Sequence, residues 1–124
     1  MILADTSIWI RHFRSANDVL SKELLRGRIA THRFIIGELA CGNLPERQQT
    51  LRYFSHLPMA TTCLDKEAMF LIERHNLMGK GIGYIDAHLL ASAMINGLTL
   101  WTADRRLQEI AHSFNIGFVG EIPE

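Results

Sequence analysis

Four acidic side chains in this sequence have surroundings that solvent exposure does not explain: Asp5, Glu38, Asp86 and Asp104. Asp5 directly follows the apolar run 2–4, and Asp104 closes the segment that begins with the apolar run 98–101. Both positions are typical of the carboxyl end of a buried strand, where a helix begins. Because parallel strands end at the same edge of a sheet, we expect these two carboxylates to lie close together. Capping of the following helix is the alternative role for each of them.

The other two acids are expected on helices, on the side that faces the core. In the predicted helix 84–96, three polar residues recur every four positions and are interpreted as the solvent face: His88, Ser92 and Asn96. Asp86 precedes that stripe by two residues, so its side chain points about 200° away from it. Glu38 likewise has apolar helical neighbours, including Ile35. An unpaired buried carboxylate is unfavourable and takes up a proton or a cation, unless an arginine neutralises it.

Carboxylates gathered in one cleft have a defined chemical use. Together the four acids predict a site for a hard divalent cation with oxygen ligands, Mg²⁺ or Mn²⁺. Such an ion neutralises phosphate oxygens, activates a water and stabilises the leaving oxygen in phosphodiester hydrolysis. Thr6, Ser7 and Thr102 are expected to hold a ligand, a metal-bound water or a phosphate through their hydroxyls, with helix capping as the alternative.

Short strands that alternate with longer helices must position these residues. Strands are predicted at 2–4, 29–31, 98–101 and 117–119, with a weaker candidate at 59–61. Helices are predicted at 6–13, 18–26, 32–41, 45–56, 65–78, 84–96 and 104–114. Asp65 is the expected N-cap of its helix, and Gly97 is expected to end another. This alternation indicates an α/β fold with a mainly parallel sheet.

Length and composition set the limits of these interpretations. The 124 residues are 48% hydrophobic and 21% charged, which predicts a single domain over 1–124. The net charge is zero, so any affinity for nucleic acid must come from local clusters of basic residues. No apolar run reaches the roughly 18 residues of a membrane span, and the start lacks a signal peptide's basic region. We therefore expect a cytoplasmic protein without membrane contact, in which Cys41 and Cys63 are reduced and buried.

The acids stand in sequence contexts that resemble those of a known family, the PIN domain. The contexts are Leu3-Ala4-Asp5-Thr6-Ser7, Glu38, Gly83-Tyr84-Ile85-Asp86-Ala87-His88-Leu89-Leu90-Ala91 and Thr102-Ala103-Asp104. Within that family the sequence most resembles the VapC ribonuclease toxins of bacterial and archaeal toxin–antitoxin pairs. The resemblance extends over residues 2–119. One departure is Leu107, where relatives often carry an aromatic residue, and it concerns packing more than chemistry.

The resemblance has implications for fold, activity and partners. It implies a three-layer α/β/α sandwich with a central, mainly parallel sheet. It implies endonucleolytic cleavage of RNA, often a tRNA or a ribosomal RNA loop, with Mg²⁺ or Mn²⁺ as cofactor. The acidic quartet of the family then corresponds to Asp5, Glu38, Asp86 and Asp104. Homodimers and a VapB-like antitoxin that blocks the site are the implied partners.

Basic and apolar residues supply candidates for the contacts with RNA and with the antitoxin. The side chains expected to bind RNA are Arg11, Lys80, Arg105 and Arg106. Arginine suits this role because its planar fork binds two phosphate oxygens at once, although a solvated surface is the alternative for each. The candidates for an antitoxin groove are Leu20, Leu24, Leu25, Leu51 and Phe54.

Two other classes of function remain open at this point. A phosphoacceptor domain of the receiver or phosphatase type also places an aspartate at a strand end. However, a dehalogenase-type phosphatase needs a second acid where Ser7 stands, and a receiver needs its aspartate where Thr61 and Thr62 stand. A catalytically silent binding module, with its carboxylates paired to arginines, is the other alternative.

Overall fold

A short parallel sheet forms the centre of the molecule. The structure, a computed structural model, describes residues 1–120, so the last four residues of the predicted domain 1–124 lie outside it. The strands are β1 (Ile2–Ala4), β2 (Ile29–Ala30) and β3 (Thr99–Trp101), in the order β2-β1-β3. Ile2 pairs with Ile29 on one side and with Thr99 on the other, and both pairings are parallel. Asp5 and Thr102 therefore leave the sheet at the same edge.

The strand predictions are confirmed for the buried runs 2–4, 29–31 and 98–101, and only partly for 59–61 and 117–119. Leu3 and Ala4 are fully buried because helices cover a parallel sheet on both faces, which is why these strands lack polar alternation. The segments 59–61 and 117–119 each contribute a single parallel bridge, Thr31 to Met59 and Leu100 to Gly117. Pro58 before the first segment and Gly117 in the second weaken strand pairing, which explains why these pairings do not extend.

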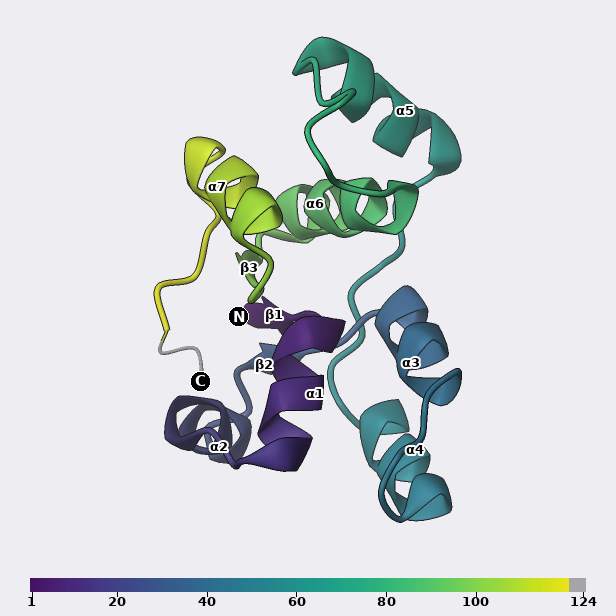
Figure 1. Ribbon diagram of the computed structural model, residues 1–124, viewed down its shortest axis with the longest axis vertical. Helices are drawn as coiled ribbons and strands as arrows, with labels where there is room; N and C mark the ends of the chain where they lie inside the picture. Colours follow the sequence, from purple (N-terminus) through teal and green to yellow (C-terminus); the bar gives the residue numbers. More distant parts are fainter. Residues whose placement is uncertain (121–124) are drawn as a thin grey trace.

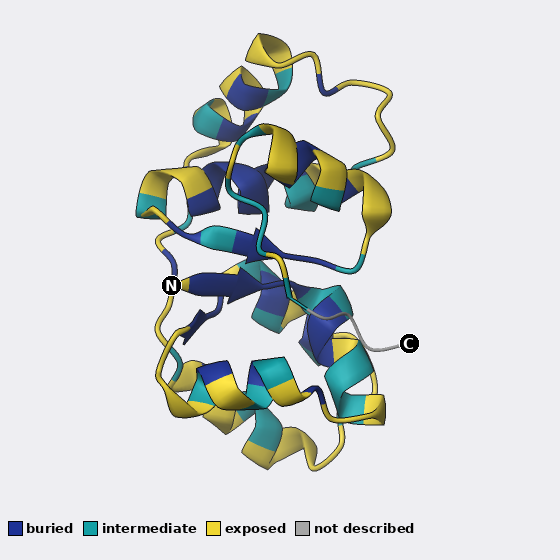
Figure 2. Cartoon of the chain, turned by 90° about the vertical axis from the view of Figure 1, so that its left-hand side faces the viewer, coloured by how far each residue is buried: buried dark blue, intermediate teal, exposed yellow. Residues whose placement is uncertain are grey.

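Seven helices are found among residues 1–120, and they complete a three-layer α/β/α sandwich around the parallel sheet. They are α1 (Thr6–Arg14), α2 (Asp18–Leu25), α3 (Arg33–Ala40), α4 (Arg47–Ser55), α5 (Asp65–Arg74), α6 (Tyr84–Asn96) and α7 (Arg105–Ser113). In Figure 1, α5, α6 and α7 lie above the strands, and α1 to α4 lie beside and below them. The strands are buried except at Thr99, the half-buried first residue of β3, whereas most helices show one buried and one exposed side (Figure 2).

Local capping chemistry sets most of the helix ends. Asp5, Asn17 and Asp104 each accept a hydrogen bond from a backbone N–H in the first turn of the following helix. Gly97 ends α6 with a positive φ of 66°, as predicted. The predicted N-cap role of Asp65 is wrong, because Leu64 occupies that position and its N–H donates to Glu67 Oε1 at 2.7 Å. Asp65 is left to form contacts with α6.

The expected solvent face of α6 is wrong. His88 and Ser92 are buried, because the segment that leads into α5 packs over them. The Cys63 N–H donates to Ser92 Oγ at 3.1 Å, and the Asn96 amide donates to the carbonyl of Thr61 at 2.9 Å. A helix that is covered on nearly all sides retains polar residues only where partners reach them.

The two cysteines differ in their surroundings. Both are free thiols, and Cys63 is buried as expected, whereas the expected burial of Cys41 is wrong because it lies exposed just after α3. Within residues 1–120, no helix combines the length and the apolar character that crossing a membrane requires.

Candidate functional site: an acidic edge of the sheet

Asp5 occupies the junction between β1 and α1. The residue is only 6% exposed, and its carboxylate accepts hydrogen bonds from Ser7 Oγ at 2.5 Å and from the Ile8 N–H at 3.3 Å. Its own N–H donates to the carbonyl of Trp101 at 3.0 Å, which fixes it beside the end of β3. Burial raises the pKa of Asp5, and the hydrogen bonds from Ser7, Thr102 and Ile8 offset part of that rise.

Hydroxyl groups join this junction to the one that follows β3. Ser7 Oγ accepts a hydrogen bond from the Ala103 N–H at 2.9 Å and lies 3.4 Å from Thr102 Oγ1. Thr102 Oγ1 in turn accepts from the Asp104 N–H at 3.0 Å. Two loops that are almost a hundred residues apart in sequence are therefore held together by two side chains. Ser7 and Thr102, predicted as supporting hydroxyls, both lie in this network.

Asp104 is exposed at the start of α7. Its Oδ1 accepts from the N–H groups of Arg106 and Leu107 at 2.9 and 3.2 Å, which leaves Oδ2 outside the cap. The sequence left two roles open for Asp104, capping of the following helix and proximity to Asp5. Asp104 combines both. A capping carboxylate at this position also brings the positive end of the α7 dipole to the same edge.

Asp86 lies in the first turn of α6 and is half-buried. Its Oδ2 accepts from the Gly83 N–H at 3.0 Å. Burial raises the pKa of Asp86, and the negative charge of Asp104 raises it further. The two carboxylates are thus electrostatic neighbours. The prediction that Asp86 faces away from solvent is confirmed in part. The reasoning behind it was wrong, because His88 and Ser92, which were interpreted as the solvent face, are themselves buried.

Glu38 lies at the margin of this edge, on α3. The expected core-facing position is wrong, because Glu38 is exposed and its helix buries Ile35 and Leu39 instead. Its Oε1 accepts a hydrogen bond from Thr6 Oγ1 at 2.8 Å. Thr6 directly follows Asp5, so this bond ties Glu38 to the β1–α1 junction. The third predicted hydroxyl therefore also contacts one of the four acids.

The acids form a chain of neighbours with an excess of acceptors. We refer to Asp5, Glu38, Asp86 and Asp104, with the hydroxyls of Thr6, Ser7 and Thr102, as the acidic edge. None of the ion pairs found among residues 1–120 involves one of its four carboxylates. This contradicts the expectation behind the silent binding module, in which an arginine neutralises each acid.

The donor chemistry of the acidic edge fits a hard divalent cation. Carboxylate and hydroxyl oxygens are the ligands that Mg²⁺ and Mn²⁺ prefer, and a cation relieves the cost of ionising Asp5 and Asp86. No group of three acidic, histidine or cysteine side chains within residues 1–120 is close enough to hold a metal ion. The prediction that the four carboxylates gather in one cleft is therefore not confirmed for these residues. The carboxylates are instead linked in pairs through hydroxyls and charge.

Two of the predicted RNA contacts lie together next to the acids. The side chain of Arg106 packs directly over the backbone of Gly81, which adopts a positive φ of 81°. A side chain at that glycine would collide with the guanidinium group. Lys80 is the neighbour of Gly81, so two cations from α7 and from the loop before α6 share one surface. Arg105 is also exposed, and Arg11 is partly exposed on α1.

Sequence reasoning missed a buried polar network beside this edge. His88 Nδ1 lies 3.2 Å from Cys63 Sγ, and His88 Nε2 lies 2.8 Å from Asp65 Oδ1. Ser92 Oγ lies 3.1 Å from His32 Nε2 and continues the network across the core. The four-residue spacing of His88 and Ser92 was the signal, but it was interpreted as solvent exposure.

The chain matches known proteins along nearly its whole length. The family model described as PIN domain matches residues 2–113. Ribonuclease VapC32 of Mycobacterium tuberculosis, from the strains CDC 1551 / Oshkosh and ATCC 25618 / H37Rv, is 35% identical over 123 residues. That match covers 98% of this chain and 99% of the mycobacterial protein. The chain belongs to the PIN domain family. Within it, this PIN domain is of the VapC type.

A solved structure agrees with this PIN fold. The crystal structure of PAE2754 from Pyrobaculum aerophilum aligns with a TM-score of 0.63 at 19% identity, over 87% of this chain and 82% of that one. At that identity the likeness concerns the fold alone. The predicted PIN-like sandwich and the VapC-type resemblance are confirmed, and the phosphoacceptor alternatives are set aside. All four acids of the acidic edge fall within the range of the PIN match.

Proposed function

We propose that this PIN domain is a divalent-metal-dependent endoribonuclease that acts as the toxin of a VapBC-type toxin–antitoxin pair. The observation that carries the proposal is the hydroxyl bridge between Asp5 and Asp104, which holds two acids from opposite ends of the sequence at one edge of the sheet. The 35% identity to a protein named as a ribonuclease supports the reaction class.

Asp5, Asp86 and Asp104 would hold the ion, and Glu38 would complete a second position or orient a water. When bound, the ion supplies charge neutralisation at the phosphate and an activated water. Ser7 and Ile8 hold the carboxylate of Asp5 by hydrogen bonds, so it does not reorganise when substrate arrives. Burial around Asp5 keeps bulk water from weakening its attraction for a cation.

The substrate we propose is RNA, with a tRNA or a ribosomal RNA loop as its preferred form. Lys80, Arg105 and Arg106 are exposed close to the acidic edge, and none of them takes part in an ion pair found among residues 1–120. Such a local cluster can bind the phosphate backbone of RNA even though the net charge of the protein is zero. We place this activity in the cytoplasm, where those RNAs are found.

The antitoxin we propose is VapB-like and occupies the apolar groove that runs from α1 to the α3–α4 turn. Phe13, Leu39 and Leu44 line this groove, while Arg14 and Glu38 lie at its margin. A segment bound there reaches Glu38 and can thereby block the acidic edge. The groove residues expected from the sequence are wrong for this groove, because none of the five lines it, and Leu20 and Phe54 are fully buried in the core. A homodimer completes the proposed assembly.

Cleavage assays with purified protein test this function. We expect structured RNA to be cut internally with Mg²⁺ or Mn²⁺, and cleavage to stop when a chelator is added and return when the metal is restored. Sequencing of the RNA ends after induced expression identifies the target. Undiminished cleavage in chelator, or no cleavage of any cellular RNA with either metal, overturns the proposal.

A further inference from the structure

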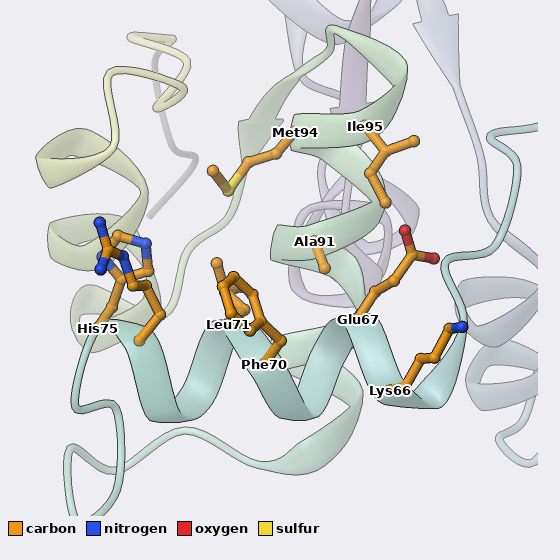
Figure 3. Close-up of a pocket in the computed structure, with 9 residues that line it drawn as sticks. Lys66, Glu67, Phe70, Leu71, His75, Ala91, Met94 and Ile95 are labelled. Atoms are coloured by element: carbon orange, nitrogen blue, oxygen red, sulfur yellow. The ribbon is translucent and has the colours of Figure 1, made fainter.

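Two pockets lie where α5 and the loop after it meet α6, at opposite ends of α6. The larger is an apolar groove of about 550 Å³ at the C-terminal end, where Phe70 and Leu71 on α5 face Ala91 and Met94 on α6 (Figure 3). The smaller has a volume of about 160 Å³ and lies at the N-terminal end, where Asp86 is also found. The helix from Asp86 to Met94 spans about 12 Å, so only the smaller pocket adjoins the acidic edge.

The smaller pocket is walled by one aromatic ring and by aliphatic side chains. We refer to it as the Tyr84 pocket, and its side-chain lining consists of Tyr84, Ala87, Ile72, Leu77, Met78 and Ile82. None of these side chains is charged at neutral pH. Pockets for drug-sized ligands measure about 300–1,000 Å³, so a pocket of about 160 Å³ fits one small ring system. The lining therefore suits a flat, uncharged ring.

Tyr84 is held in place and still keeps an exposed surface. Its hydroxyl donates to Asp65 Oδ1 at 2.8 Å, and its ring packs edge to face with the buried ring of His88, with 4.7 Å between the ring centroids. Although the side chain is fixed at these two points, Tyr84 is 43% exposed. A ring that is fixed before binding loses little conformational freedom when a ligand stacks on it.

Gly83 connects the Tyr84 pocket to the acidic edge. It lines the pocket, and its N–H donates to Asp86 Oδ2 at 3.0 Å. Its φ of −96° is accessible to any residue, and a Cβ at this position would have only Asp86 Oδ2 within 4 Å among residues 1–120. Neither the backbone nor the packing of the fold therefore requires glycine here. The absence of a side chain keeps the space between the pocket and Asp86 open.

Basic side chains accompany the loop that closes the pocket. Gly79 and Ile82 line the Tyr84 pocket, and Lys80 and Gly81 lie between them in the chain. The guanidinium group of Arg106 packs over Gly81. Neither Lys80 nor Arg106 takes part in an ion pair found among residues 1–120. An apolar pocket and two available cations therefore share one loop.

We propose that the Tyr84 pocket binds one unpaired nucleobase of the RNA substrate, which stacks on Tyr84 next to the phosphate that is cleaved. A nucleotide joins a flat, uncharged ring to an anionic phosphate, and the pocket, the two cations and the acidic edge match these parts. A base enters such a pocket only when it is not stacked in a duplex, so the pocket selects single-stranded or looped RNA. The inference rests on the proposed function and adds how the substrate is recognised.

Binding of two probes in the presence of chelator tests the pocket without cleavage. One probe is a single-stranded uridine oligomer, and the other is an abasic ribose-phosphate oligomer of the same length and charge. Wild type is expected to bind the uridine oligomer about tenfold more tightly, because one base stacks on the tyrosine ring. Tyr84→Ala is expected to lose this preference. Tyr84→Phe keeps the ring and removes only the hydrogen bond to Asp65, so it is expected to retain the preference.

A second pair of variants tests the pocket even if Tyr84→Ala does not fold. Met78 and Met69 are similarly exposed, at 53% and 49%, and of the two only Met78 lines the Tyr84 pocket. Met78→Ala is expected to reduce the preference for the uridine oligomer about threefold, because the base loses part of one apolar wall. Met69→Ala is expected to leave the preference unchanged. Circular dichroism confirms that each variant is folded.

Several results overturn the inference. They are equal binding of the two probes by wild type, an unchanged preference in folded Tyr84→Ala, and equal effects of Met78→Ala and Met69→Ala. A loss in Tyr84→Phe as large as in Tyr84→Ala also overturns it, because the tyrosine then acts only through its hydrogen bond. If Tyr84→Ala abolishes only the binding of a co-expressed antitoxin, the pocket belongs to that protein and the proposal fails.

The nuclease proposal fails or stands separately. Cleavage of RNA by wild type without a preference for the uridine oligomer rejects the nucleobase pocket alone. A clear preference in wild type that cleaves no RNA with Mg²⁺ or Mn²⁺ rejects the nuclease chemistry and leaves the pocket as an RNA-binding site.

Discussion

Two polar networks lie close to the sheet, and they differ in how donors and acceptors are matched. In the network of His32, Cys63, Ser92, His88 and Asp65, each group meets a partner of the opposite kind. The Phe34 N–H donates to His32 Nδ1, so the other ring nitrogen carries the proton toward Ser92 Oγ. Burial lowers the pKa of His32 to about 4 and raises the pKa of the Cys63 thiol, so both stay uncharged at neutral pH.

The acidic edge has the opposite character. Its four carboxylates accept hydrogen bonds only from hydroxyls and backbone N–H groups, and burial raises the pKa of both Asp5 and Asp86. A network with matched donors and acceptors stabilises the fold by itself, whereas an excess of carboxylate acceptors destabilises it until a cation binds. We therefore infer that the first network is structural and that the acidic edge is kept for chemistry. Four predictions test this difference, ordered from the largest expected effect to the smallest.

Asp5→Asn is expected to lower RNA cleavage by roughly a thousandfold, because it removes a buried negative charge that attracts the ion while keeping an acceptor for Ser7. Single-turnover cleavage rates at saturating Mg²⁺ measure this effect. The matched control is Asp18→Asn, an exposed acid in the first turn of α2, which is expected to leave the rate unchanged. Equal rates for wild type and Asp5→Asn contradict the assignment of the acidic edge.

Ser92→Ala is expected to destabilise the fold by about 2 kcal/mol and to leave cleavage by the folded protein unchanged. The change leaves the Cys63 N–H and the His32 ring nitrogen without an acceptor in the core. Urea unfolding measures the loss against Ser113→Ala, whose hydroxyl bonds only within α7. A stable Ser92→Ala variant with a strongly reduced cleavage rate reverses the roles that we infer for the two networks.

Arg106→Gln is expected to weaken RNA binding several-fold. It is also expected to reduce the slope of log affinity against log salt concentration by about one, which corresponds to one lost phosphate contact. The guanidinium group lies over Gly81, and its proposed role is to contact the backbone of the RNA. Binding to a catalytically inactive variant, measured over a range of salt concentrations, gives the slope. Lys22→Gln, on the exposed side of α2, is the control, and an equal effect of both changes indicates a non-specific charge effect.

Asp86→Asn is expected to raise the metal-free free energy of unfolding at neutral pH by roughly half a kcal/mol, since the charge is partly screened. The folded state binds the Asp86 proton more tightly than the unfolded chain does, because burial and the charge of Asp104 raise its pKa. The ionised carboxylate thus costs stability above that pKa. The gain from Asp86→Asn fades as the pH falls through the raised pKa. Unfolding in chelator at several pH values measures it, and clear destabilisation at neutral pH argues against neighbouring carboxylates.

Local sequence signals accounted for the elements that carry the acids. The apolar run 2–4 followed by Asp5 predicted a buried strand with a capped helix, and both are present. The same reasoning placed Asp104 correctly at the start of α7. These features depend on neighbours within a few residues, so periodicity and capping chemistry suffice to find them.

The sequence could not determine which face of a helix another element covers. It misassigned His88 and Ser92 because the covering segment, around Cys63, lies about thirty residues away in the chain. It misplaced Glu38 for a related reason, since the helix buries Ile35 and Leu39 and turns Glu38 toward Thr6. Burial depends on long-range packing, and helical periodicity alone does not determine which faces of a helix other elements cover.

The sequence by itself therefore determined the residue types, the strand ends and the helix starts, because short-range backbone and capping interactions govern those. The tertiary structure alone decided that Ser7 bridges to Thr102, that Asp104 acts on Asp86, and that Phe70 stays in water beside a groove. These relations join residues that only the parallel pairing of β1 with β3 and the packing of α5 on α6 bring together.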